Sequence, residues 1–146
     1  MSENHLIHGT AIAMEGRGTL LRGASGAGKS DLALRLIERG AQLIADDQVR
    51  LSPLEDGSLN ATTEPRLAGQ LEVRGVGILT VPYVESSPLI AVFDLVDPVD
   101  VPRLPETEWA ELIPGHKIRS FRLAPFEASA PDKVRLILGA LAQGQR

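Results

Sequence analysis

The sequence of 146 residues contains no cysteine and few aromatic residues: one tryptophan, one tyrosine and three phenylalanines. The lack of cysteine excludes disulfides, zinc–thiolate sites and thiol catalysis, and it suits a reducing cytosol. No stretch approaches the roughly 18 apolar residues of a membrane span, and the first residues lack the apolar run of a signal peptide. We therefore expect a cytoplasmic protein with no membrane partner.

Basic residues are also scarce, with 15 Lys and Arg against 19 Asp and Glu and a net charge of −4. They are scattered along the chain, so a nucleic-acid partner is not expected. The hydrophobic content of 43% allows a chain of this length to bury one core. The sequence therefore predicts a single domain over residues 1–146.

Glycine, in contrast, is concentrated in the stretch GASGAGKS, which matches the phosphate-loop pattern G-x-x-x-x-G-K-[ST] in full. In this pattern the glycines let backbone N–H groups turn toward phosphate oxygens, the lysine reaches the outer phosphates, and the serine hydroxyl ligates magnesium. The predicted ligands are a nucleoside triphosphate and Mg²⁺. A glycine-rich turn before an ordinary helix is the alternative interpretation. The predicted nucleotide-binding residues are Gly23, Ala24, Ser25, Gly26, Ala27, Gly28, Lys29 and Ser30.

Hydrophobic patterning places this loop between a strand and a helix, the context that the motif requires. Alternating β and α elements predict an α/β fold. Residues 97–117 contain four prolines, and we expect a long flexible loop there. The predicted strands are 10–14, 19–22, 42–45, 49–52, short strands within 69–81, 89–96 and 118–123, and the predicted helices are 32–39 and 134–142.

Two adjacent acids, Asp46 and Asp47, follow the strand predicted after the phosphate-loop helix. Strand ends on this side of an α/β sheet border the ligand crevice. Beside a magnesium-bound phosphate, one such acid can help to hold the metal while the other accepts the proton of an attacking hydroxyl. This division of roles is typical of kinases. An exposed Asp-Asp turn is the alternative.

Several stretches in order resemble the bacterial HPr kinase/phosphorylase family, specifically its C-terminal catalytic domain. They are His8-Gly9, GASGAGKS, RGAQLIADD at 39–47 and EVRGVGILTV at 72–81. The resemblance implies a P-loop NTPase-like mixed sheet of the HPr kinase/PEP carboxykinase type with flanking helices. It implies an HPr(Ser) kinase/phosphorylase-like phosphotransferase that uses ATP and Mg²⁺. The implied partners are an HPr-type phosphocarrier protein and further copies of the chain, as a hexamer.

The resemblance also assigns roles to individual residues. It implies that Asp46 is the general base for a serine hydroxyl and, in reverse, activates phosphate for phosphorolysis. Asp47 would bind magnesium together with Ser30, and Asp31 would stand near the metal where the family usually has glutamate. His8 would lie near Asp46 and tune its charge. The catalytic residues implied are Asp46, His8, Arg103 in the predicted loop, and Lys29.

Two other functions remain open from the sequence. A small-metabolite kinase of the shikimate or gluconate type also places acids after the phosphate-loop helix, but those enzymes need an arginine-rich lid, and residues 97–117 hold only Arg103. A nucleotide-sensing regulatory module would bind ATP without turnover. The intact acid pair argues against that second alternative.

Overall fold

The computed structural model describes residues 4–144, and within them one large mixed sheet carries two helices. The α/β class with a mixed sheet and flanking helices is thereby confirmed. No helix among the described residues is long and apolar enough to cross a membrane. The strands are β1 (His5–His8), β2 (Thr10–Met14), β3 (Arg17–Arg22), β4 (Gln42–Ala45), β5 (Gln48–Pro53), β6 (Leu59–Thr62), β7 (Gln70–Val73), β8 (Gly77–Thr80), β9 (Ser86–Leu95), β10 (Glu108–Ile113) and β11 (His116–Leu123), and the helices are α1 (Lys29–Ile37) and α2 (Ala130–Ala142).

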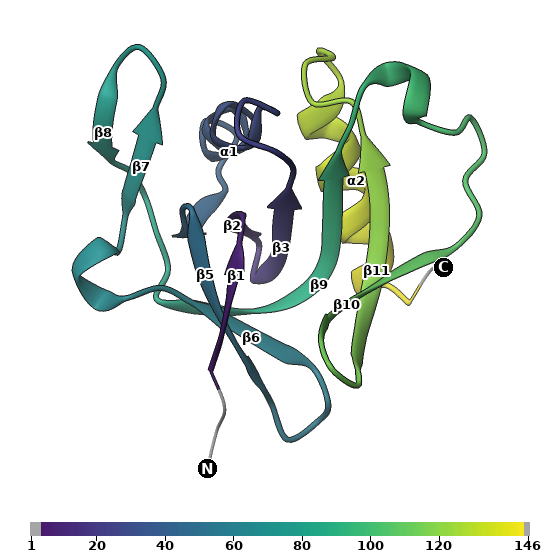
Figure 1. Ribbon diagram of the computed structural model, residues 1–146, viewed down its shortest axis with the longest axis horizontal. Helices are drawn as coiled ribbons and strands as arrows, with labels where there is room; N and C mark the ends of the chain where they lie inside the picture. Colours follow the sequence, from purple (N-terminus) through teal and green to yellow (C-terminus); the bar gives the residue numbers. More distant parts are fainter. Residues whose placement is uncertain (1–3, 145–146) are drawn as a thin grey trace.

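The large sheet has the order β1-β5-β6-β9-β3-β2-β4, and β11 pairs with β9 while β10 pairs with β11. Strand β9 is parallel to both β3 and β11, and the other pairs are antiparallel. Its first residues pair with β6 and its later residues with β3 and β11. Figure 1 shows β9 sweeping across the molecule and then turning upward between β3 and β11.

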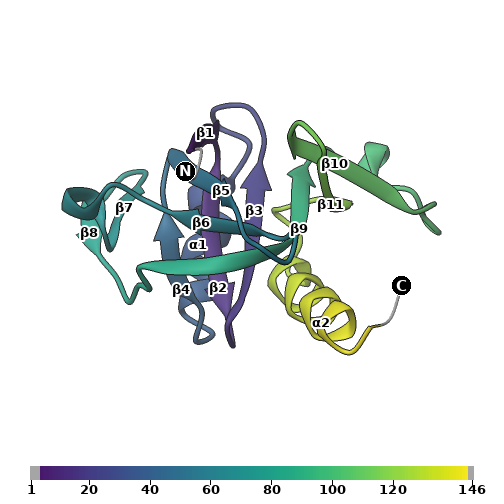
Figure 2. The ribbon, with the colours of Figure 1, turned by 90° about the horizontal axis from the view of Figure 1, so that it is seen from below.

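The small second sheet is a hairpin of β7 and β8, which lies at one edge of the molecule. Figure 2 shows β10 and β11 at the opposite edge. The predicted short strands within 69–81 are therefore confirmed. Gly75 lies in the turn between the two strands, and Gly77 begins β8. Both have positive φ angles (83° and 116°), which favour glycine over residues with a Cβ.

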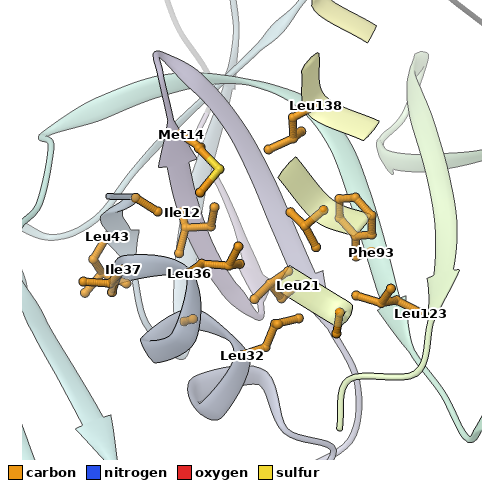
Figure 3. Packing of buried hydrophobic residues seen from close by; sticks show 14 of the residues in the cluster. Ile12, Met14, Leu21, Leu32, Leu36, Ile37, Leu43, Phe93, Leu123 and Leu138 are labelled. Atoms are coloured by element: carbon orange, nitrogen blue, oxygen red, sulfur yellow. The ribbon is translucent and has the colours of Figure 1, made fainter. Parts of the chain in front are cut away.

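Strand β2 is buried on both faces because it separates two apolar cores. Ile12 and Met14 point into a core shared with both helices, whereas Ala11 and Ala13 point into a core closed by β1, β5, β6 and β10 and their neighbours. This alternation follows the two-residue period of a strand. Figure 3 shows the first core, in which Leu32 and Leu36 of α1 face the sheet residues.

Helix α1 begins at Lys29 and ends at Ile37, so it starts and ends earlier than the predicted range 32–39. Its C-terminus is closed by the N–H of Gly40, which donates to the carbonyl of Ile37. Gly40 has a φ of 99°, a left-handed conformation common just past a helix end. Gly40 therefore ends the helix.

The predicted flexible loop over residues 97–117 is wrong in its second half, because Glu108–Ile113 forms β10. Trp109 and Ala110 there pair with Arg119 and Ile118 of β11. All four prolines lie outside this strand. Pro105 and Pro114 stand on either side of it, and they made the whole segment resemble a loop. Ala110 and Leu112 are buried in the second core, and this tertiary burial stabilises the strand.

Candidate active site

The phosphate loop connects β3 to α1 and takes its shape from glycines. Gly26 and Gly28 have φ angles of 84° and 101°, which residues with a Cβ adopt only at an energetic cost. The N–H of Ala27 donates to the carbonyl of Ala24 at 2.9 Å, and Gly28 is the N-cap of α1. The first backbone N–H groups of a helix have no intrahelical acceptor. A loop of this shape in front of a helix N-terminus is able to bind an anion.

Lys29 is the first residue of α1, and its side chain bends back across the loop. Its Nζ donates to the carbonyl oxygens of Gly23 at 2.6 Å and Ala24 at 3.1 Å. The ammonium group therefore lies beside the loop backbone, where it can neutralise a bound polyphosphate. Ser30 and Asp31 follow in the first helical turn and line the same cleft.

Asp46 follows β4, and both of its carboxylate oxygens are hydrogen-bonded. Thr10 Oγ1 donates to Oδ1 at 3.0 Å, and the backbone N–H of Glu72 donates to Oδ2 at 3.0 Å. Thr10 is buried at the start of β2, whereas Glu72 belongs to the β7–β8 hairpin. Two donors from separate elements fix the plane of the Asp46 carboxylate. Each carboxylate oxygen still has a second lone pair with which to accept a proton.

Asp47 has a different environment, because its side chain is 75% exposed and its backbone has a φ of 69°. Aspartate tolerates this left-handed conformation better than most residues. The backbone carbonyl of Asp47 accepts a hydrogen bond from the N–H of Gly9 at 3.0 Å. The turn therefore presents the two neighbouring carboxylates differently: Asp46 is oriented by neighbours, and Asp47 is open to solvent and ligand.

His8 pairs with Asp47 and lines the same cleft as Asp46, and its predicted effect on the charge of Asp46 stays a prediction. The His8 Nδ1 lies 3.4 Å from Asp47 Oδ1. The reason is the strand register: β1 pairs antiparallel with β5, and His8 stands opposite Gln48, the residue after Asp47. Thr10, two residues later in β2, is the strand residue on this side that donates to Asp46.

These side chains share one cleft of about 460 Å³. The phosphate loop supplies one wall, the acid pair with His8 and Thr10 supplies another, and the hairpin adds Glu72, Val73 and Arg74. The cleft brings Lys29, Ser30, Asp31, Asp46, Asp47 and His8 together, as their predicted roles require.

Arg103 is not among the residues that line this cleft. It lies exposed in the segment that precedes β10, and Figure 1 shows that β10 and β11 lie across β9 from the β7–β8 hairpin. The structure therefore does not bring Arg103 to the other predicted catalytic residues. Arg74 of the hairpin is the arginine that lines the cleft.

Five residues that line the cleft were given no role by the sequence analysis. The hairpin residues Glu72, Val73 and Arg74 were quoted only within a family-like stretch, and Thr10 and Phe126 were not singled out. Thr10 is selected by strand pairing, since Ala11 stands opposite Ala45, next to Asp46 in the chain. No local sequence pattern indicates that β2 pairs with β4. Phe126 is separated by nearly a hundred residues from the loop that it contacts. It follows Leu123, Ala124 and Pro125 in the sequence, so no local signal distinguishes it from an ordinary apolar residue.

Among residues 4–144, no three His, Asp or Glu side chains gather closely enough to hold a metal without further ligands. Magnesium usually keeps several waters and takes one or two carboxylates plus substrate phosphates. The hydroxyl of Ser30 and the carboxylates of Asp31 and Asp47, which border one cleft, supply oxygen donors of that kind. The donor set fits magnesium in company with a polyphosphate.

Comparison with known proteins gives one consistent result. A family model described as "HPr Serine kinase C-terminal domain" matches residues 1–85. The HPr kinase/phosphorylase of Leptospira biflexa serovar Patoc is 47% identical over 74 residues, which are 51% of this chain and 23% of that protein. The HPr kinase/phosphorylase of Clostridium novyi is 46% identical over 76 residues, 52% of this chain and 24% of that protein. The matched segment thus spans only about a quarter of these curated relatives.

The likeness extends further in three dimensions than in sequence. The solved structure of the Hpr(Ser) kinase/phosphatase from Coxiella burnetii superposes with a TM-score of 0.76 and 25% sequence identity. It covers 96% of this chain and 95% of that chain. The part of the fold beyond residue 85, which the family model does not match, therefore also has a structural counterpart.

Proposed function

Because the chain belongs to the HPr serine kinase C-terminal domain family, we propose that it transfers the γ-phosphate of ATP to a serine of an HPr-type phosphocarrier protein. In the reverse direction it removes that phosphate by phosphorolysis. The observation that carries the proposal is the joint position of a complete phosphate loop and the Asp46–Asp47 pair in one cleft. A phosphate loop alone indicates nucleotide binding, whereas a carboxylate beside it supplies the base that a kinase needs.

Binding of the triphosphate falls to the loop backbone and Lys29. The N–H groups of the glycine-rich loop and the positive end of the α1 dipole attract the phosphates. Lys29 then exchanges its contacts with the carbonyls of Gly23 and Ala24 for phosphate oxygens. Ser30, Asp47 and Asp31 would hold Mg²⁺, which when bound neutralises phosphate charge and orients the terminal phosphate.

Asp46 is the proposed proton acceptor. As the serine oxygen of the partner attacks the γ-phosphorus, its proton passes to the Asp46 carboxylate and ADP leaves with the electrons of the broken P–O bond. The hydrogen bonds from Thr10 and from the N–H of Glu72 hold the carboxylate ready for this transfer. In phosphorolysis the same group takes a proton from inorganic phosphate, whose oxygen attacks the phosphorus of the phosphoserine. The P–O bond to serine breaks, pyrophosphate forms, and the serine oxygen leaves with the proton returned by Asp46.

The partner would approach over the β7–β8 hairpin, which borders the cleft and exposes apolar side chains. Val76 and Ile78 are each 66% exposed there, and exposed apolar groups that cluster beside a site favour protein contacts. We also propose that copies of the chain assemble into a closed oligomer, with a hexamer as the expected form.

The deciding experiment measures transfer of labelled phosphate from ATP to purified HPr-type proteins and to a panel of small hydroxyl metabolites. We expect label on the protein, located by mass spectrometry on one serine, and no label when that serine is replaced by alanine. Label on a metabolite instead would overturn the proposal in favour of a small-metabolite kinase. Nucleotide binding with no transfer to any acceptor would favour a regulatory module.

A further inference from the structure

A solvent-exposed phenyl ring forms part of the phosphate-loop cleft. Phe126 lies in the turn between β11 and α2, lines the cleft, and is 69% exposed. Among the described residues that line the cleft, it is the only phenylalanine, tyrosine or tryptophan. An exposed ring contributes little to the apolar core, and both core clusters lack Phe126. Its position therefore calls for another explanation.

The ring packs directly on the backbone of the phosphate loop. A Cβ built on Gly28 would lie 2.9 Å from Cζ of Phe126 and 3.0 Å from its Cε1. Both distances are shorter than a normal carbon–carbon contact. In this conformation a Cβ at position 28 would clash with the ring, so the ring stands at the N-terminus of α1, beside the backbone that is proposed to bind phosphate.

The turn that carries Phe126 is fastened to α1 by Arg35. Its Nη2 donates to the carbonyl of Pro125, and its Nη1 donates to the carbonyl of Glu127 at 3.4 Å. The same guanidinium pairs with Asp31 at 3.0 Å. Arg35 therefore bonds to the residues on both sides of Phe126 in sequence, which positions the backbone that carries the ring.

The hairpin that is bonded to Asp46 and the helix that follows the Phe126 turn lie on opposite sides of α1. The bond to the β7–β8 hairpin runs from Glu72 to Asp46, and Figure 1 shows this hairpin on one side of α1 and α2 on the other. A triphosphate whose terminal phosphate faces Asp46 directs its nucleoside away from the acids. The ring is then the aromatic surface available to the base.

We propose that Phe126 is the nucleobase platform of this site, on which the purine of the bound nucleotide stacks. This inference rests on the proposed function, because it takes the terminal phosphate to face the acids. Stacking between a base and an aromatic ring contributes to affinity whatever the identity of the base. Phe126 thus distinguishes a nucleoside triphosphate from a polyphosphate that carries no base.

The test compares two ligands that share phosphates and differ in the base. Calorimetric titration with Mg-ATP and with magnesium tripolyphosphate is run on the wild type, Phe126→Ala and Phe126→Tyr. We expect Phe126→Ala to weaken ATP binding by roughly 5- to 100-fold, to leave tripolyphosphate within about twofold, and Phe126→Tyr to retain ATP affinity. The matched control is Leu136→Ala, which removes an equally exposed apolar side chain (75%) outside this cleft and should change neither affinity.

Equal weakening of both ligands by Phe126→Ala would overturn the proposal, because the ring would then only shape the loop through Gly28. An unchanged ATP affinity would also overturn it, and phosphate transfer by that variant would leave the proposed function standing. If the wild type bound neither ligand, the phosphate-loop assignment and this proposal would both fail.

A second readout does not depend on removing the ring. Trp109 is the only tryptophan of the chain, so Phe126→Trp in a Trp109→Phe background places a single fluorophore on the platform. We expect Mg-ATP to quench its emission and magnesium tripolyphosphate to leave it unchanged, since only the former carries a base. Equal responses to the two ligands would contradict stacking.

Discussion

The Oδ2 of Asp46 accepts a hydrogen bond of 3.0 Å from the backbone N–H of Glu72, 26 residues further along the chain. This bond connects Asp46, which follows β4 of the large sheet, to the β7–β8 hairpin, which forms a separate two-stranded sheet. The N–H of Glu72 is free to donate outward because the ladder of an antiparallel pair leaves alternate N–H groups pointing away from the partner strand. The proposed base and the wall of the cleft are thus mechanically linked.

We predict that Asp46→Ala loosens the hairpin as well as abolishing transfer. Without the carboxylate, the Glu72 amide loses its acceptor, and its hydrogen exchange should accelerate by about tenfold, the change that a loss of roughly 1.4 kcal/mol produces. Amide exchange followed by NMR or mass spectrometry measures this. Asp47→Ala is the control, because its side chain has no contact with the hairpin among the described interactions, and it should leave that amide unchanged.

Asp46→Asn and Asp47→Asn should fail in different ways. Asp46→Asn is expected to keep nearly normal Mg-ATP affinity and to lose transfer by roughly 10²-fold or more, the usual scale for removing a general base. Its phosphorolysis should fall in the same proportion. Asp47→Asn should weaken nucleotide binding only when magnesium is present. Titrations with and without magnesium beside both activity assays decide this, and the opposite pattern would exchange the two roles.

Lys29→Ala should abolish productive use of Mg-ATP and keep the fold. Its Nζ contacts only loop carbonyls among the described residues, so no core packing is lost when it is removed. Circular dichroism checks the fold, and nucleotide titration with an activity assay checks function. Lys117→Ala, which removes an exposed cation from β11, is the control that should transfer phosphate normally. Normal transfer by Lys29→Ala would refute the phosphate-loop assignment.

Gly26→Ala and Gly28→Ala form a matched pair for the contact with Phe126. Both positions have positive φ, and strain of about 1–2 kcal/mol is expected at each. Only Gly28 also has the ring within 3.0 Å of a new Cβ, whereas Gly26 has nothing within 4 Å. Gly28→Ala should therefore lower the melting temperature more than Gly26→Ala does. Adding Phe126→Ala to Gly28→Ala should remove this difference between the two glycine variants. If the double variant had the same melting temperature as Gly28→Ala, the Phe126 ring would move aside for the new Cβ without cost.

Acid sensitivity should be measurable at the turn between β5 and β6. The Ser58 hydroxyl donates to Asp56 Oδ1 at 2.6 Å, and the Ser58 N–H donates at 2.9 Å. These two bonds lower the pKa of Asp56 from its ordinary value, and the bond from the Ser58 hydroxyl has the larger effect. The ionised form stabilises the turn above the unfolded-state pKa, and the contribution disappears as the pH falls through the lowered folded-state pKa. NMR titration should show Ser58→Ala raising this pKa.

Features that depend on adjacent residues were predictable. The phosphate loop is one continuous motif, the strand before it and the capping Gly40 are set by local patterning, and Asp46–Asp47 directly follows a short apolar strand. The helix boundary was less accurate, since the loop geometry at Gly28 starts α1 three residues before its first periodic leucine, Leu32. Strand β10 was missed because its stability comes from pairing with β11 and burial.

The sequence by itself determined that a phosphate-loop motif precedes a helix and that two carboxylates follow the next strand, because both are matters of spacing along the chain. Only the tertiary structure decided what surrounds each group. Strand register places His8 beside Asp47 and Thr10 beside Asp46. The hydrogen bonds of Arg35 hold the turn that carries Phe126 against a loop nearly a hundred residues earlier in the chain. Such neighbours depend on long-range pairing and packing, which local residue patterns do not encode.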